Sequence, residues 1–235
     1  MPHLSPIQTP DLNGRWDIYG AVHKGLRMFQ LELLVRIGRA DFGDDATVRA
    51  IVADMRGIIA LGASHLRHEN DHIHRAMERK QPGEVDRLED QHDSHERDFA
   101  DLELLLQAIE QADTRMRKVL ARRLYLGYTA FVAHDLEHMH EEETVANPML
   151  QAMFTDRELE AIEMGIIADL TPEKTIAYMR LMIPASNPDE RVAMLGGMKA
   201  AAPPEAFAAV IDLAARPTLN AKDFADLSRR LGIEG

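Results

Sequence analysis

Histidine and acidic residues gather in four separate stretches of this sequence. Ten of the 11 histidines lie between positions 23 and 140, nine of them in the stretches 23–24, 65–72, 91–96 and 134–143. In the last three stretches an aspartate or glutamate lies about one helical turn from a histidine. Imidazole and carboxylate groups bind iron, zinc and manganese. The pattern therefore predicts a metal site to which several segments contribute.

The composition narrows the chemistry of that site. The chain has 235 residues and no cysteine, so disulfides, thiolate metal sites and iron–sulfur clusters are excluded, and imidazole and carboxylate remain as the strong ligands. A chain of this length can bury roughly 70% of the surface that it exposes when unfolded, which is enough for one sizeable core. The absence of cysteine is typical of a reducing cytoplasm, where we expect the protein to lie.

The charge balance argues against two classes of partner. The net charge of -12 repels nucleic acid and anionic membranes, and no dense patch of lysine and arginine offsets it. The first 14 residues lack a basic segment followed by an apolar run, and no apolar stretch approaches membrane-spanning length. We therefore expect no nucleic-acid partner, no membrane insertion and no export.

Apolar residues recur at spacings of three and four through most of the chain, which predicts an all-α fold. Short loops between long helices make neighbours antiparallel and favour an up-down-up-down four-helix bundle. Asn147-Pro148 should kink or shorten the last helix. The four long helices are expected at about 15–39, 46–79, 84–112 and 114–151.

The remainder of the chain should form shorter helices. Thr155 and Glu158 form a capping-box pattern, and further helix starts are expected at 171–173, 187–188, 203–204 and 220. This segment contains no histidine. We predict two units, a metal-binding bundle at 15–151 and a helical appendage at 152–235, and the appendage should pack on the bundle or on a second subunit in a homodimer.

Depth and direction select the candidate ligands. At 1.5 Å per residue the four groups lie at similar depths in an antiparallel bundle, and each residue advances the helix by about 100°. Residues that face or border the apolar stripes are primary candidates, and their close neighbours are secondary ones. The primary set is His23, His65, Glu69, His92, His138 and Glu142, the secondary set is His68, His72, His95, Glu96, His134 and Glu143, and His74 and His140 are expected to face away.

A second metal pattern was weighed against this set. Ferritin-like bundles use Glu-x-x-His motifs on two helices and single glutamates on the others, and the sequence offers such motifs at 69–72, 89–92 and 137–140. However, His140 is expected on a polar face, and the first helix presents His23 rather than a glutamate at the right depth. The histidine-rich set is therefore favoured.

The favoured residues resemble the hemerythrin-like, or HHE cation-binding, family over about residues 23–150. The resemblance is carried by His23-Lys24-Gly25-Leu26-Arg27, His65-x-x-x-Glu69, His92-x-x-x-Glu96-x-x-Phe99 and His138-Met139-x-x-Glu142-Glu143. It implies a four-helix bundle with an oxo- or hydroxo-bridged pair of irons and an open position for a small ligand. His23, His65, His92 and His138 would be terminal ligands, and Glu69 and Glu142 would bridge.

One position departs from the family pattern, because oxygen-carrying members have a second histidine where Glu96 stands here. A site with fewer imidazoles and more carboxylate should weaken reversible oxygen storage, unless His95 or His134 substitutes. Three functions remain open: binding or sensing of oxygen, nitric oxide, peroxide or iron itself; an enzyme that turns over peroxide or nitric oxide; and a helical scaffold with a structural metal. Zinc, manganese or nickel can use the same donors.

Overall fold

All regular structure is helical in residues 14–233, the part of the chain that the computed structural model describes. This confirms the all-α prediction. Two of the long helices continue without a break through a π-helical segment into a further α-helix. The four long helical runs are α1 (Gly20–Arg39), α2 with η1 and α3 (Asp45–His68, Glu69–His74, Arg75–Lys80), α4 (Asp86–Gln111) and α5 with η2 and α6 (Thr114–Glu141, Glu142–Ala146, Asn147–Met153).

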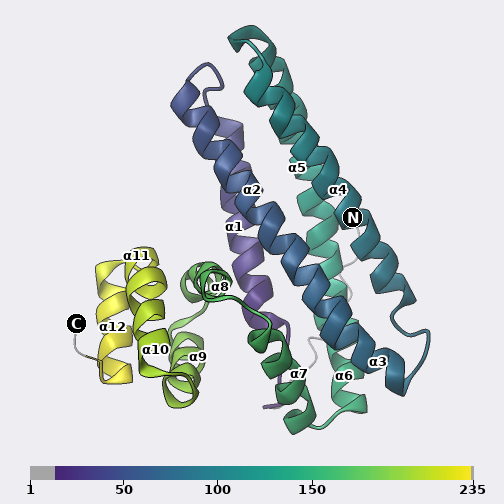
Figure 1. The fold of residues 1–235 in the computed structure, drawn as a ribbon, viewed down its shortest axis with the longest axis vertical. Coiled ribbons are helices and arrows are strands. Elements are labelled where there is room, and N and C mark those ends of the chain that lie inside the picture. The colour runs from purple at the N-terminus through teal and green to yellow at the C-terminus, as the bar shows by residue number, and fades with distance from the viewer. Residues whose placement is uncertain (1–13, 234–235) are drawn as a thin grey trace, which may run out of the picture.

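The four long runs lie side by side in Figure 1. Helix α1 packs against α2 and α5, and α4 packs against the same two helices. Side-chain caps fix two of the helix starts, since Asp44 accepts a hydrogen bond from the backbone N–H of Thr47 and Asp113 accepts one from that of Met116. Each long helix therefore has two long neighbours against which to bury its apolar stripe.

Two apolar clusters fill the space between these helices. One contains Leu33, Met55 and Leu124 and lies towards the α1–α2 and α4–α5 turns. The other contains Met77 and Leu150 and lies at the opposite ends of the long runs. None of the helices within residues 14–233 has both the length and the apolar character needed to cross a bilayer.

The long helical runs differ from the regular helices predicted from the sequence because each of two runs contains a π-helical segment. Segment η1 begins at Glu69 and η2 begins at Glu142. A π-helix closes its hydrogen bonds between residues five apart, which rotates everything that follows relative to an α-helix. As a result Ala146 is buried, whereas Val145 is 51% exposed.

The last helix was expected to be kinked or shortened at Asn147-Pro148, and it is not shortened there. Helix α6 continues to Met153, and Pro148 lies in its first turn, directly after η2. A proline has no N–H to donate and is best accommodated where the regular pattern of helical hydrogen bonds is already interrupted. The π-helical segment provides such an interruption.

The C-terminal part forms shorter helices that begin where the capping signals predict. Thr155 and Glu158 form a capping box, and Thr171, Asn187 and Asn220 each cap the helix that follows. The helices are α7 (Asp156–Ala168), α8 (Pro172–Ala185), α9 (Pro188–Ala201), α10 (Pro204–Val210) with η3 (Ile211–Ala215) and α11 (Arg216–Thr218), and α12 (Ala221–Leu231).

These shorter helices contact the long ones at two places. Helices α8 to α12 share an apolar cluster that includes Ile183, Leu195 and Phe207. Helix α8 packs along α1, where a Cβ on Gly25 would lie 3.0 Å from the Leu181 backbone, so the glycine permits the close approach. Helix α7 instead contacts η1. The C-terminal helices thus pack on the long ones, the first of the two arrangements expected, while the homodimer and the boundary at 151–152 stay predictions.

Candidate metal centre

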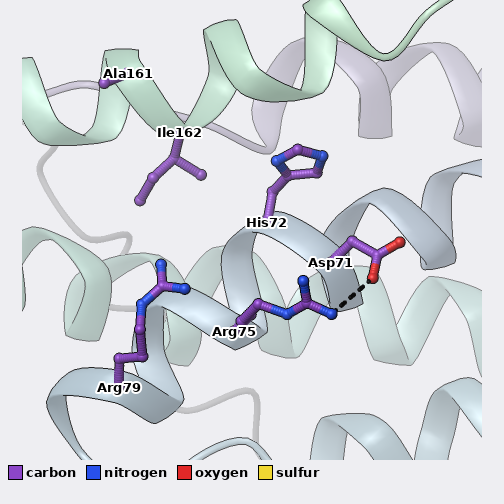
Figure 2. A pocket seen from close by; sticks show the side chains of 6 residues that line it. All are labelled: Asp71, His72, Arg75, Arg79, Ala161 and Ile162. Atoms are coloured by element: carbon purple, nitrogen blue, oxygen red, sulfur yellow. Dashed lines mark hydrogen bonds and ion pairs between the residues drawn. The ribbon is translucent and has the colours of Figure 1, made fainter.

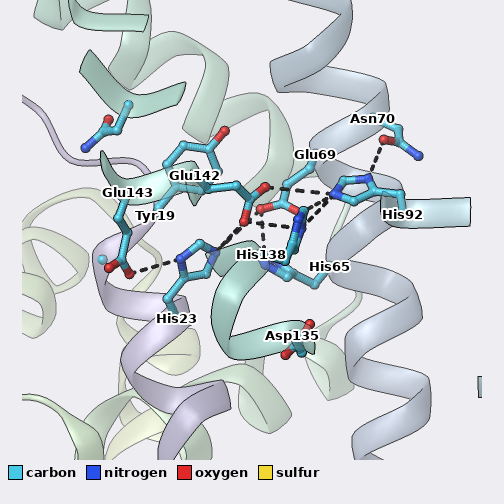
Figure 3. A network of polar contacts seen from close by, with 12 residues as sticks. Tyr19, His23, His65, Glu69, Asn70, His92, Asp135, His138, Glu142 and Glu143 are labelled. Atoms are coloured by element: carbon cyan, nitrogen blue, oxygen red, sulfur yellow. Dashed lines mark hydrogen bonds and ion pairs between the residues drawn. The ribbon is translucent and has the colours of Figure 1, made fainter. Parts of the chain in front are cut away.

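The six primary candidate residues lie together in the interior. Figure 3 shows their side chains converging from α1, α2, η1, α4, α5 and η2. All six are buried, the most exposed being His65 at 9%. They form two groups of potential metal ligands, whose donor atoms lie within 4.8 Å of one another in each group. The groups are His23, His65 and Glu69, and Glu69, His92, His138 and Glu142, so that Glu69 belongs to both.

The groups form a polar layer between the two apolar clusters. On the run that carries Glu69, Leu66 belongs to one cluster and Ile73 to the other. On α4, His92 lies between Leu88 of one cluster and Phe99 of the other. Water therefore has little access to these polar side chains, and an unpaired charge placed there would be costly.

The first group joins α1 to the α2–η1 run. His65 and Glu69 are four residues apart and share a helix face, and the Nε2 atom of His65 lies 3.1 Å from Oε1 of Glu69. The Nε2 atom of His23 lies 3.7 Å from the same oxygen and 3.3 Å from Oε2 of Glu142. Two imidazoles thus face one carboxylate oxygen, with a second carboxylate beside it.

The second group joins η1, α4 and α5. The Nε2 atoms of His92 and His138 lie 3.1 Å apart, close to the roughly 3.0 Å expected of two ligands at right angles around a cation about 2.1 Å away. Oε2 of Glu69 lies 3.6 Å from Nε2 of His92, and Oε2 of Glu142 lies 3.4 Å from Nε2 of His138. Glu69 therefore presents one oxygen to each group.

In three of the imidazoles the nitrogen Nδ1 faces away from the donor groups and contacts a side-chain oxygen. The residue that supplies this oxygen is in each case a sequence neighbour of another candidate ligand. The Nδ1 atom of His92 lies 2.7 Å from Oδ1 of Asn70, and that of His138 lies 2.7 Å from Oε1 of Gln91. The Nδ1 atom of His23 lies 3.0 Å from Oε1 of Glu143. With Nδ1–H donating to these oxygens, each Nε2 carries the lone pair that a metal needs.

These anchoring residues were not assigned their role from the sequence. Each one adjoins a primary candidate in the chain: Asn70 follows Glu69, Gln91 precedes His92, and Glu143 follows Glu142. Their position beside the candidates was the only available signal, and it did not say which imidazole each would reach. In the structure every one of them anchors a histidine on a neighbouring helix.

Burial shifts the pKa values of the cluster towards its neutral forms. It raises the pKa of Glu69 and, together with the charge of Glu69, raises that of Glu142 well above its ordinary value. Burial likewise lowers the pKa of His92 to about 3 and that of His138 to about 2, with neighbouring imidazoles adding to the effect. A cation would reverse the cost of ionising the carboxylates.

Glu143 behaves differently from the two buried glutamates. Burial would raise its pKa, but hydrogen bonds from His23 and Arg27 lower it to about 2. Burial also opposes protonation of His23, yet the hydrogen bond with Glu143 and the nearby carboxylate of Glu69 raise its pKa overall. Glu143, a secondary ligand candidate, therefore lies behind His23 as a charged anchor and is not a member of either donor group.

Six buried polar atoms of the cluster have no hydrogen-bond partner in the described part of the chain. They are Nε2 of His23, Nε2 of His65 and both carboxylate oxygens of Glu69 and Glu142. Buried polar groups are almost always paired, and these atoms face one another across the site. This donor set could hold metal ions through imidazole nitrogen and carboxylate oxygen.

The other secondary candidates lie outside the two donor groups. His68 is buried beside Tyr178 of α8, and Nε2 of His72 lies 2.8 Å from Oδ2 of Asp169. His134 and Glu96 are exposed. The extra carboxylate that the comparison of Glu96 with the family pattern suggested is therefore not part of the cluster.

His95 is buried beside the cluster, and its Nδ1 has no hydrogen-bond partner in the described part of the chain. Its ring lies 4.9 Å from that of His138, measured between centroids, and its Nδ1 lies 3.7 Å from Oδ1 of Asp135. The other oxygen of Asp135 accepts a hydrogen bond of 2.6 Å from Gln30. This Asp135–Gln30 pair was not expected from the sequence.

The expected outward direction of His74 is wrong. Its side chain is fully buried, and its ring stacks on that of His92 with centroids 4.9 Å apart. The face assignment assumed 100° per residue, whereas His74 ends the π-helical segment that begins at Glu69. In such a segment the residue five positions on returns to the same face. His140, by contrast, is exposed as expected.

The structure does not assemble the ferritin-like alternative. Of the residues its Glu-x-x-His motifs would need, His140 and Glu89 are exposed, and His72 pairs with Asp169 outside the cluster. Figure 2 shows a hollow at His72, which is also lined by Arg75 and Ile162 among others. Its lining residues are exposed or half-buried, so the hollow is separate from the buried cluster.

The chain matches no protein-family model. None of the curated proteins matches it either.

Proposed function

We propose that the chain is a hemerythrin-like protein that holds two iron ions in a carboxylate-bridged centre and binds or senses a small ligand there. The observation that carries this proposal is the double membership of Glu69, whose two oxygens face different groups of imidazoles. A carboxylate with one oxygen towards each group is suited to bridging two cations. The packing of each long helix against two others supports an up-down-up-down four-helix bundle as the scaffold.

The donors divide between the two ions as the distances suggest. His23 and His65 would hold one iron and His92 and His138 the other, with Glu69 and Glu142 shared between them. Imidazole and carboxylate suit iron, and the same donors accept zinc, manganese or nickel. Bound iron would supply a redox couple and an open coordination position for a ligand. The protein anchors three of these four imidazoles through Nδ1 and excludes water from the site.

Burial favours a ligand of very few atoms. The six donors lie between apolar clusters and are at most 9% exposed, so a substrate of ordinary metabolite size has no route to them in this conformation. Oxygen, nitric oxide and peroxide are small enough, and iron itself is a further candidate signal. We favour binding or sensing over turnover, since Glu96, the residue that suggested an additional carboxylate in the site, is exposed.

Iron loading followed by ligand titration tests this function. The purified chain, reconstituted anaerobically with Fe(II), should take up two irons, and its absorption spectrum should change in proportion to added nitric oxide or oxygen. Steady consumption of nitric oxide or peroxide would instead support the enzyme alternative. Protein that binds iron without any spectral response to these ligands would point to the scaffold alternative, and protein that binds no metal would contradict all three.

A further inference from the structure

One row of exposed side chains runs along the outer side of α5. At about 100° per residue, positions three and four apart share one side of a helix. The exposed residues at this spacing are Arg115, Val119, Arg122, Leu126, Ala130, Ala133 and Glu137. Val119 is 55% exposed and Leu126 is 50% exposed. Single exposed apolar side chains are common, but a row of them at this spacing is typical of a helix that packs against another helix.

The two ends of this row carry opposite charges. Arg115 lies near the start of α5, and Glu137 lies about 33 Å further along the helix. Neither belongs to an ion pair within residues 14–233, where Arg117 and Glu141 of α5 instead pair with α2 and α4. The C-terminal helices pack on α1 and η1, and Figure 1 shows α8 to α12 on the far side of α1 from α4 and α5. In a single copy the row therefore faces solvent.

The row is complementary to itself when a second copy of α5 runs antiparallel to it. A two-fold axis at Leu126 pairs each residue with the one that lies equally far beyond that position in the second copy. Leu126 then meets its own counterpart, and Val119 meets Ala133. Arg115 meets Glu137 at one end of the contact, and Glu137 meets Arg115 at the other. Apolar side chains thus lie at the centre and unlike charges at both ends.

Helix α4 continues this complementarity beside α5. Arg97, Asp101 and Leu104 are exposed on α4 at the same spacing of four and three residues. Because α4 and α5 are antiparallel neighbours joined by a short turn, Arg97 and Asp101 lie about 3 Å to either side of the level of Leu126. The same two-fold axis therefore brings Arg97 opposite Asp101 of the second copy. Leu104, which is 63% exposed, adds a further apolar side chain to the face.

We propose that the outer face of α4 and α5 pairs with the same face of a second copy, forming a two-fold symmetric homodimer. The face is about 40 Å long and two helices, or about 20 Å, wide, which gives roughly 800 Å² per copy, the size of a standard protein–protein interface. The long helices form this contact, and the C-terminal helices lie outside it. The dimer does not depend on the metal centre, so it can be tested on the metal-free full-length chain.

Charge reversal followed by mixing tests this arrangement. One variant carries Arg97→Glu and Arg115→Glu, and the other carries Asp101→Arg and Glu137→Arg. Alone, each variant brings like charges together at every charged contact, so its dimer dissociation constant should rise by about 100-fold. In an equimolar mixture each reversed charge meets a reversed partner, and the dissociation constant should return to within about tenfold of the wild-type value.

Sedimentation equilibrium measures the assembly, and the wild type should approach twice the chain mass of 26.4 kDa. Arg39→Glu with Arg49→Glu is the matched control, because it makes the same change in net charge at exposed positions of α1 and α2; its dimer should be as stable as that of the wild type. A wild type that stays monomeric overturns the proposal, and so does a dimer that both interface variants leave intact. Variants that dissociate alone but do not associate when mixed overturn the antiparallel pairing.

Discussion

Replacing Glu69 with glutamine should remove both metal ions at once. Glutamine keeps the shape of the side chain but has no negative charge with which to bridge two cations. Glu69 faces His65 with one oxygen and His92 with the other, and it is the one residue common to both donor groups. Replacing His65 with glutamine, by contrast, removes a donor from one group only.

The number of bound ions determines how much thermal stability each substitution should remove. An ion present at 100 times its dissociation constant stabilises the folded protein by about 2.7 kcal/mol, so two ions contribute about 5 kcal/mol. For a chain of this size, 1 kcal/mol corresponds to about 2–4 °C in Tm. We therefore expect the metal-dependent gain in Tm, about 10–20 °C in the wild type, to vanish in Glu69→Gln and to fall by about half in His65→Gln.

Thermal unfolding with and without Fe(II), under anaerobic conditions, measures this gain. Burial raises the pKa of Glu69, which means that its charged form is disfavoured in the folded protein. The metal-free Glu69→Gln protein should accordingly be at least as stable as the metal-free wild type. An equal loss of the gain in Glu69→Gln and His65→Gln would refute the bridging role, and so would a gain that survives in Glu69→Gln.

Three further predictions address the anchors, the pH dependence and the packing of the C-terminal helices. Glu143→Gln should weaken Fe(II) binding by about tenfold, because the charged anchor of His23 is lost; a chelator competition that finds unchanged affinity would contradict this. Burial raises the pKa of Glu142 well above its ordinary value, so the folded wild type binds a proton that the unfolded chain releases above about pH 4.5, and its stability falls as pH rises. In urea unfolding of the metal-free proteins, the free energy of unfolding of Glu142→Gln should therefore rise relative to that of the wild type between pH 5 and 7, by up to about 1.4 kcal/mol per pH unit. A difference that stays constant with pH would show that Glu142 is ionised throughout. Gly25→Ala should destabilise the protein by about 1–3 kcal/mol, because the added Cβ would lie 3.0 Å from the backbone of α8. Gly127→Ala, with open space around it, should instead stabilise the protein by up to about 1 kcal/mol. Equal effects of the two substitutions would contradict the close packing of α8 on α1.

The sequence predicted the positions that depend on regular helix geometry. His65 and Glu69, like His138 and Glu142, are four residues apart, so a period of 3.6 residues places each pair on one face, and all four side chains lie in the buried cluster. The helix starts at Asn187 and Asn220 were also predictable, because capping depends on local residues.

What the sequence did not reveal depends on irregular backbone and on contacts between helices. No local signal marks the π-helical segments, and a regular period beyond Glu69 sends His74 outwards, the reverse of what the structure has. Glu96 lies one helical turn from His92 in the sequence but is exposed on α4. The anchoring of His92 by Asn70 could not be predicted, since it requires the relative rotation of two helices.

The presence of two bridged metal ions is most directly tested by anomalous diffraction. Crystals of the iron-loaded protein, measured on both sides of the iron absorption edge, should show two peaks between Glu69 and Glu142, roughly 3.5–4 Å apart as in other two-metal sites. His23 and His65 should adjoin one peak, and His92 and His138 the other. A single peak, or no peak among these six residues, would contradict the account.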